Sequence, residues 1–244
     1  MIYIRKISRL ILSIPLMVIE LFATYTLHFS AKLREKLYEQ YVYDTWIKRD
    51  LQDCETVLEL GCGSGSPVLR AGYGPKTTAM EIYPSYVAQH NAKKDYKICF
   101  VNDILKWQYP AKQYDAVVAF DVLEHLDKQA IDNFDLFDKM ERCARKKVIL
   151  FTPNGFTEND EVDGDPYQKH KSAWEPSDFT KRGYTVVGAT GSRRLLGESA
   201  LPKYKPMRAW WLLSIITQPF VYDKPMMAFH SYAVKQIKQQ KGDK

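Results

Sequence analysis

The sequence predicts an α/β protein: a mostly parallel sheet with helices on both faces. From residue 56 onward, short apolar runs alternate with amphipathic stretches, a pattern typical of parallel strands joined by covering helices. In addition, the apolar run Val57–Leu60 leads directly into a glycine-rich turn and a helix start. The 244 residues, 45% hydrophobic and 26% charged, suffice for such a domain and exclude a wholly disordered chain.

The first element is an apolar helix within an N-terminal helical segment, residues 1–50. Leu10–Phe29 has helical periodicity and is long enough to span a bilayer, although Pro15 and Glu20 disfavour a simple span. Because basic residues flank this stretch, a bilayer span, an interfacial helix and a helix packed on its own domain all remain open. We expect a cytoplasmic protein, either free or held at the cytoplasmic face of a membrane through residues 1–30.

Residues 51–244 are expected to form one domain with seven strands. The expected strands are Thr56–Leu60, Thr77–Ile82, Lys97–Asn102, Tyr114–Phe120, Lys147–Thr152, Tyr184–Ala189 and Ala228–Ile237. The expected helices between them are Pro67–Ala71, Pro84–Lys93 and Lys128–Ala144.

An insertion, residues 191–227, separates the last two expected strands and is too long for a hairpin loop. It contains Met207–Tyr222, a second apolar helix preceded by basic residues. Such a helix suits a membrane contact or a cover over an apolar ligand, and it equally suits packing against the N-terminal helix.

The glycine-rich turn reads Glu59-Leu-Gly61-Cys62-Gly63-Ser-Gly65. Glycine is required where a backbone adopts positive φ or where a ligand leaves no room for Cβ. Dinucleotide-binding turns have the spacing G-x-G-x-x-G and receive a pyrophosphate, which the carboxylate of Glu59 would repel. Glu81, twenty residues after Gly61, ends the next strand, where an acid can accept both ribose hydroxyls. The expected ligand is therefore a nucleoside with a cationic amino-acid tail.

The chain resembles the S-adenosylmethionine-dependent methyltransferases of the seven-stranded Rossmann-like type. The resemblance rests on the motif VLELGCGSG and on three later motifs at strand ends, MEIYPSYV, VNDIL and YDAVVAFDVLEHL. The resemblance covers residues 50–190 and implies S-adenosyl-L-methionine as cofactor. It also implies a set of cofactor-binding residues, Glu59, Gly61, Cys62, Gly63, Gly65, Glu81, Ile82, Asp103, Ile104, Asp121 and Val122.

The residues that bind the methyl acceptor are harder to identify from the sequence, because methyl transfer depends mainly on how the protein positions the acceptor against the cofactor. His125 is the first candidate for a general base; the alternative, which we favour, is a helix-start residue that is hydrogen-bonded to backbone. Asn154, His170 and Trp174 are candidates for the acceptor pocket, with loop packing as the alternative.

Several other classes are disfavoured. The four cysteines show neither a zinc-ligand spacing nor a disulfide framework, so no metal is expected. A net charge of +6 without a concentrated basic patch does not favour nucleic acid. We expect methyl transfer to a small, apolar or lipid-like acceptor; the alternatives are a nucleic-acid or protein methyltransferase, or a non-catalytic membrane-associated relative.

Overall fold

The computed structural model describes residues 43–159, 164–197 and 200–238. The chain divides into two compact units, Met1–Val42 and Tyr43–Lys244, and the residues described here belong to the second. The predicted apolar helix at residues 10–29 and the possible anchor at residues 1–30 lie outside the described residues. Within the described ranges, no helix is both long and apolar enough to cross a membrane.

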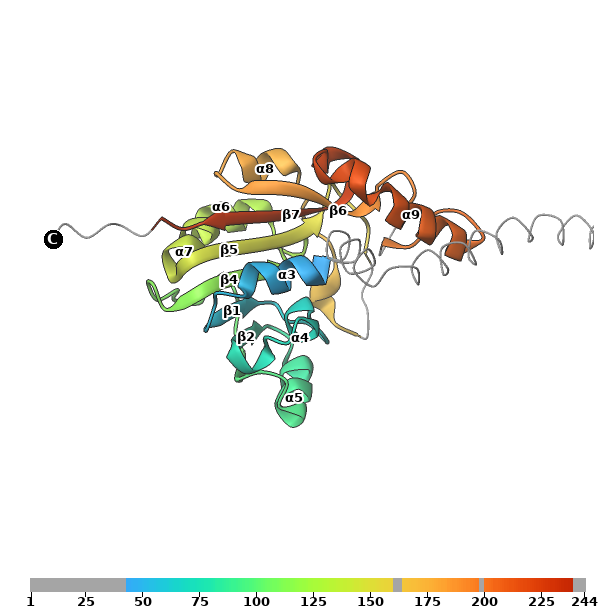
Figure 1. The fold of residues 1–244 in the computed structure, drawn as a ribbon. Helices are drawn as coiled ribbons and strands as arrows, with labels where there is room; N and C mark the ends of the chain where they lie inside the picture. Colours follow the sequence, from blue (N-terminus) through green and yellow to red (C-terminus); the bar gives the residue numbers. More distant parts are fainter. Residues whose placement is uncertain (1–42, 160–163, 198–199, 239–244) are drawn as a thin grey trace, which may run out of the picture. The chain divides into compact units, whose positions relative to one another are not determined.

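All seven expected strands are confirmed, in one sheet of order β3-β2-β1-β4-β5-β7-β6 (Figure 1). Their bounds are β1 (Val57–Leu60), β2 (Thr77–Glu81), β3 (Ile98–Val101), β4 (Tyr114–Phe120), β5 (Ala144–Pro153), β6 (Thr185–Ser192) and β7 (Ala228–Gln236). Strands β1 to β5 pair in parallel, whereas β7 pairs antiparallel with both β5 and β6. The parallel strands therefore end at one common edge, and the antiparallel β7 begins there.

The helices confirm the predicted alternation. They are α3 (Tyr43–Leu51), α4 (Pro67–Arg70), α5 (Pro84–Lys93), α6 (Lys128–Phe134), α7 (Leu136–Cys143), α8 (Pro176–Thr180) and α9 (Met207–Tyr222). The prediction of one helix over Lys128–Ala144 is wrong, because Asp135 has the left-handed φ of 55° and ends α6 before α7 begins.

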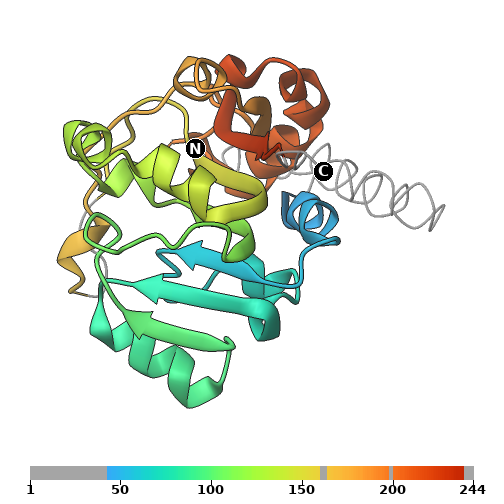
Figure 2. The ribbon, with the colours of Figure 1, turned by 90° about the vertical axis from the view of Figure 1, so that its left-hand side faces the viewer.

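Helices lie on both sides of the sheet (Figure 2). Alternate residues of the central strands pack against these opposite layers. Val117 and Ala119 of β4 pack in one cluster with apolar residues of α6, α7 and α8. Val118 and Phe120 pack in another with apolar residues of α3 and α4. Because a strand buried on both faces must be apolar throughout, β4 reads as a continuous apolar run rather than an alternating one.

Helix α9, in the predicted insertion, lies against β6 at the edge of the sheet (Figure 1). Two glycines of β6 allow this close approach. A Cβ on Gly188 would lie 2.2 Å from the carbonyl oxygen of Val221, and one on Gly191 would lie 2.2 Å from that of Ser214. The helix therefore contacts the strand backbone directly.

Candidate functional site

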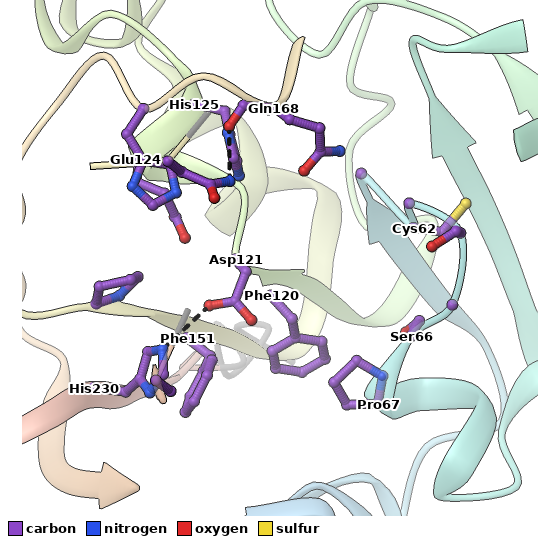
Figure 3. Close-up of a pocket in the computed structure, with 18 of the residues that line it drawn as sticks. Cys62, Ser66, Pro67, Phe120, Asp121, Glu124, His125, Phe151, Gln168 and His230 are labelled. Atoms are coloured by element: carbon purple, nitrogen blue, oxygen red, sulfur yellow. Dashed lines mark hydrogen bonds and ion pairs between the residues drawn. The ribbon is translucent and has the colours of Figure 1, made fainter. Parts of the chain in front are cut away.

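A cavity of about 480 Å³ opens at the carboxyl edge of the parallel strands (Figure 3). The turn after β1 forms one wall, and the segment after β4 forms another. Residues after β5, the end of β6 and the start of β7 complete it. The fold thus gathers residues from 59 to 230 around one space.

The glycine-rich turn has the conformation that its composition predicts. Gly61 has φ +68° and donates its N–H to the carbonyl oxygen of Met80 at 2.8 Å. A Cβ on Gly61 would lie 2.7 Å from Cγ2 of Val122, so this position has no room for a side chain. Gly63 has φ +56°, and a Cβ there would have no neighbour within 4 Å. Gly61 therefore packs against protein, whereas Gly63 faces open space.

Glu81, at the end of β2, holds the turn in place. Its buried carboxylate accepts the N–H of Gly63 at 2.8 Å and that of Tyr83 at 2.9 Å. His90 braces the same turn, because its Nε2 donates to the carbonyl oxygen of Gly63 at 2.9 Å. Asp95 accepts from the other ring nitrogen of His90 at 2.8 Å. Since a carboxylate has about four lone-pair sites, Glu81 retains acceptor capacity for two hydroxyls.

Glu59 is buried beneath the turn and lines the cavity. One carboxylate oxygen accepts the hydroxyl of Ser66. The buried Oε2 makes no hydrogen bond of good geometry among the described residues, although the hydroxyl of Tyr96 is near enough to interact with this carboxylate. Burial raises the pKa of Glu59 to about 7. An unpaired buried carboxylate oxygen is costly and suits a ligand that brings a hydrogen-bond donor or a positive charge.

These features fit S-adenosylmethionine, a nucleoside that carries ribose hydroxyls and an amino-acid tail. Gly63 and Gly65 leave the cavity wall open, since neither would bring a Cβ within 4 Å of protein. Glu81 has acceptor capacity for the ribose, and the orphaned oxygen of Glu59 suits the ammonium group, directly or through water.

Cys62 also lines the cavity, but its side chain is buried in a small cluster with Ala79 and Val87. Its Sγ lies 3.9 Å from the Sγ of Cys99, and both thiols are free. Cys62 therefore contributes backbone, and no thiol, to the cavity wall.

Five of the residues proposed for the cofactor do not line the cavity: Glu81, Ile82, Asp103, Ile104 and Val122. The first four lie at or just after the ends of β2 and β3. Asp103 accepts the N–H of Leu105 at 2.9 Å and pairs with Lys106 at 3.0 Å, while Ile104 is buried in the core. They thus lie on the side where the resemblance expects the adenosine, and their roles stay predictions.

Asp121 and Val122 follow β4 as expected. Asp121 has the left-handed φ of 52°, which L-residues rarely adopt and which marks a constrained position. Its Oδ1 lies 3.7 Å from Nε2 of His230 across the cavity (Figure 3). Val122 is buried against Gly61, so it shapes the turn through packing.

His125 and His170 meet, although 45 positions separate them, with ring centroids 4.7 Å apart. Both line the cavity beside Glu124. Burial, together with the neighbouring His170, lowers the pKa of His125 to about 4. Burial also lowers the pKa of His170. Both imidazoles are therefore neutral at neutral pH and carry a free lone pair.

Asn154 and Trp174 do not line the cavity, so the structure does not support the prediction that they form an acceptor pocket. The Asn154 amide donates to the carbonyl oxygens of Pro225 at 2.6 Å and Ala228 at 2.8 Å, which ties β5 to the start of β7. Trp174 is fully buried and stacks on Phe179 at 5.6 Å. Both side chains are therefore occupied by contacts within the protein and are not available to a ligand.

Sequence reasoning missed other residues of the cavity wall, above all His230, Thr157 and Gln168. His230 begins the antiparallel strand, and burial lowers its pKa to about 3. The signal was available in principle, because an antiparallel last strand starts where the parallel strands end.

The chain matches the model of a methyltransferase domain family over residues 24–187. No curated protein is significantly similar in sequence. Among solved structures, TehB from Haemophilus influenzae is similar with a TM-score of 0.51, at 13% identity, over 80% of this chain and 61% of that one.

Two further structures have TM-scores of 0.49. A SAM-dependent methyltransferase from Archaeoglobus fulgidus is 15% identical over 82% of this chain and 97% of its own. The PH0226 protein from Pyrococcus horikoshii is 13% identical over 86% and 93%, respectively. At these identities, the likenesses concern the fold alone.

The family model spans well over half of the chain, and the turn after β1 fits the cofactor. This chain therefore belongs to the methyltransferase domain family and is an S-adenosylmethionine-dependent methyltransferase.

Proposed function

We propose that this methyltransferase acts on a small, apolar or lipid-like acceptor that it meets at a membrane surface. The observation that carries this proposal is the orientation of α9. Its polar side chains face the sheet and its large apolar side chains face outward, the reverse of an ordinary surface helix.

The inner face of α9 satisfies its polar groups on β6. The Gln218 amide donates to the carbonyl oxygen of Gly188 at 2.7 Å and accepts the N–H of Gly191 at 2.8 Å. Ser214 donates to the carbonyl oxygen of Thr190 at 3.0 Å. Thr190 itself lines the cavity, so α9 is docked directly behind part of the cavity wall.

The outer face of α9 is apolar. Trp211, Ile216 and Phe220 are 58%, 52% and 72% exposed. The remaining members of this face are Met207, Leu213 and Ile215. The exposed Lys203 and Lys205 lie just before the helix. An apolar helix face flanked by lysines is the composition that binds an anionic lipid surface.

The chemistry requires little beyond positioning. The cofactor supplies a methyl carbon made electrophilic by the attached sulfonium. The glycine turn and Glu59 line the cavity and would hold the donor together with Glu81, which accepts the N–H of Gly63. The wall that carries His125 and His170 lies across that cavity.

Transfer of a radiolabelled methyl group into a total cell extract tests the acceptor class. Separation into lipid, small-molecule, protein and nucleic-acid fractions should place most of the label in the lipid or apolar small-molecule fraction. Label mainly in nucleic acid or in protein would overturn this proposal in favour of those acceptors. Cofactor binding without label in any fraction would favour a non-catalytic protein.

Flotation with anionic phospholipid vesicles tests the membrane contact. Replacement of Trp211, Ile216 and Phe220 by serine should abolish flotation. The matched control places serine at Ile98 and Val101, which are 52% and 49% exposed at the sheet edge, and should float like the wild type. If the outer face of α9 instead binds residues 1–30 of the same chain, removal of those residues will increase flotation. If residues 1–30 are the anchor, their removal will release the protein.

A further inference from the structure

Glu124, His125 and His170 form a cluster with the composition of a metal centre. Each offers one ligand atom, and these three atoms lie within 4.8 Å of one another. All three residues line the cavity that the glycine-rich turn also lines. Figure 3 shows Glu124 and His125 there. The spacing of these residues along the chain does not indicate a metal site, because 45 positions separate the two histidines.

Backbone hydrogen bonds join the two segments that carry the cluster. Glu124 and His125 lie in the 3-10 turn Leu123–His125, directly after β4. The carbonyl oxygen of Glu124 accepts the N–H of Lys171 at 2.7 Å and that of Ser172 at 3.0 Å. These two bonds fix the segment that carries His170 against the turn that carries the other two side chains.

The ring of His170 has a defined tautomer. Its Nδ1 lies 2.5 Å from the carbonyl oxygen of Thr157, which can only accept a hydrogen bond, so Nδ1 carries the proton. The lone pair is therefore on Nε2. A backbone carbonyl that fixes the outer nitrogen of a histidine is the arrangement commonly found behind metal-binding imidazoles.

His125 and Glu124 complete the cluster. Nδ1 of His125 is buried and has no hydrogen-bond partner among the described residues, although backbone groups of Gln168 and Lys169 hydrogen-bond its ring. The carboxylate of Glu124 is buried and accepts the hydroxyl of Thr152 at 2.9 Å. A buried nitrogen without a partner, beside a second imidazole and a carboxylate, indicates an absent ligand.

We propose that Glu124, His125 and His170 bind one divalent cation, and that this cation holds a hydroxyl oxygen of the methyl acceptor. Two imidazoles and one carboxylate suit Mn²⁺, Co²⁺, Fe²⁺ or Zn²⁺ better than Ca²⁺, which prefers oxygen ligands alone. Three protein ligands leave coordination positions open toward the cavity, as catalytic sites do. The cation site depends only on the cluster, whereas its role toward the acceptor rests on the proposed function.

Asp121 is not part of this cluster. Its carboxylate faces His230, 3.7 Å away, and the three clustered ligand atoms come from other residues. His230 lines the same cavity and thus provides a matched control: a histidine of the same wall that should not bind the cation.

Titration of the chelator-treated full chain with Co²⁺ alone tests the site, with calorimetry and visible absorption as readouts. We expect saturation at one Co²⁺ per chain and a visible band typical of nitrogen and oxygen ligands. His170→Asn should weaken binding at least tenfold, and so should Glu124→Gln. His230→Asn should bind Co²⁺ within about twofold of the wild type. Absence of saturation, or equal binding by wild type and His170→Asn, would overturn the site.

Titration of the same samples with S-adenosylhomocysteine tests the cofactor site independently of the metal site. His170→Asn should retain its affinity for that ligand, which shows that the domain is folded and its cofactor half intact. If wild type binds S-adenosylhomocysteine but not Co²⁺, the metal site falls and the methyltransferase assignment stands. Methyl transfer into extract should fall at least tenfold after chelation and return with added Mn²⁺ or Co²⁺. Full transfer in the presence of chelator would overturn the role of the cation toward the acceptor.

Discussion

Alanine substitutions at the three glycines of the turn after β1 should destabilise the protein in a graded order that the geometry sets. Gly65 has no positive φ and no neighbour within 4 Å of a built Cβ, so Gly65→Ala should change the unfolding free energy by no more than about 0.5 kcal/mol. Gly63 has φ +56° without a steric neighbour. Gly63→Ala should therefore cost about 1–2 kcal/mol, the penalty of an L-residue in the left-handed region.

Gly61→Ala combines strain with a clash. Its φ is +68°, and the added Cβ would lie 2.7 Å from Cγ2 of the buried Val122. Overpacking of a core costs about 1–3 kcal/mol, so the total should reach about 2–5 kcal/mol. Val122→Ala removes the atoms of the clash. The double variant should therefore be about 1–3 kcal/mol more stable than the sum of the two single substitutions predicts.

Urea denaturation followed by circular dichroism measures all five variants, the double variant included, on one scale. The order Gly65, Gly63, Gly61 should appear in the midpoints at unchanged slope. If Gly61→Ala is as stable as Gly65→Ala, or if Val122→Ala does not rescue it, the packing described for this turn is wrong.

Three further substitutions test other contacts. Glu81→Gln replaces one carboxylate oxygen, an acceptor, by an amide NH2 group that faces the N–H of Gly63 or Tyr83. The affinity for S-adenosylhomocysteine, measured by calorimetry, should therefore fall about 10- to 100-fold. Although burial acts to raise it, hydrogen bonds from Arg145 and from backbone lower the pKa of Asp115 below 3.8. A lowered folded-state pKa stabilises the protein above the unfolded value and ceases to do so as pH falls through the folded one. Asp115→Asn should therefore cost about 1.5–3 kcal/mol at pH near 7, with a difference from wild type that shrinks below pH about 4 in urea titrations. An unchanged difference at low pH would contradict this assignment. Lys94 ends α5 with φ 57°, so Lys94→Gly should raise the unfolding free energy by about 0.5–1 kcal/mol, and a lower melting temperature would refute that reasoning.

The centre of the sheet could be predicted because its strands are buried on both faces and therefore appear as apolar runs. Val57–Leu60 and Tyr114–Phe120 are buried throughout, and both were found within one residue. The turn between α6 and α7 could not be predicted, because the left-handed conformation of Asp135 leaves the apolar spacing around it helical.

The cofactor half of the site could be predicted because its residues follow strands at fixed offsets. The opposite wall depends on tertiary contacts instead. His125 meets His170 because the carbonyl oxygen of Glu124 holds the backbone at residues 171 and 172, a contact with no local signature. Asn154 is expected in an acceptor pocket at the carboxyl edge of the sheet, yet its amide is occupied by carbonyl oxygens near the start of β7.

Calorimetric titration of the purified full chain with S-adenosylhomocysteine tests most directly whether the turn after β1 holds an adenosyl amino acid. We predict saturable heat at one ligand per chain, reduced in Glu81→Gln, and no heat with NAD. Saturation by NAD together with no heat from S-adenosylhomocysteine would contradict the assignment.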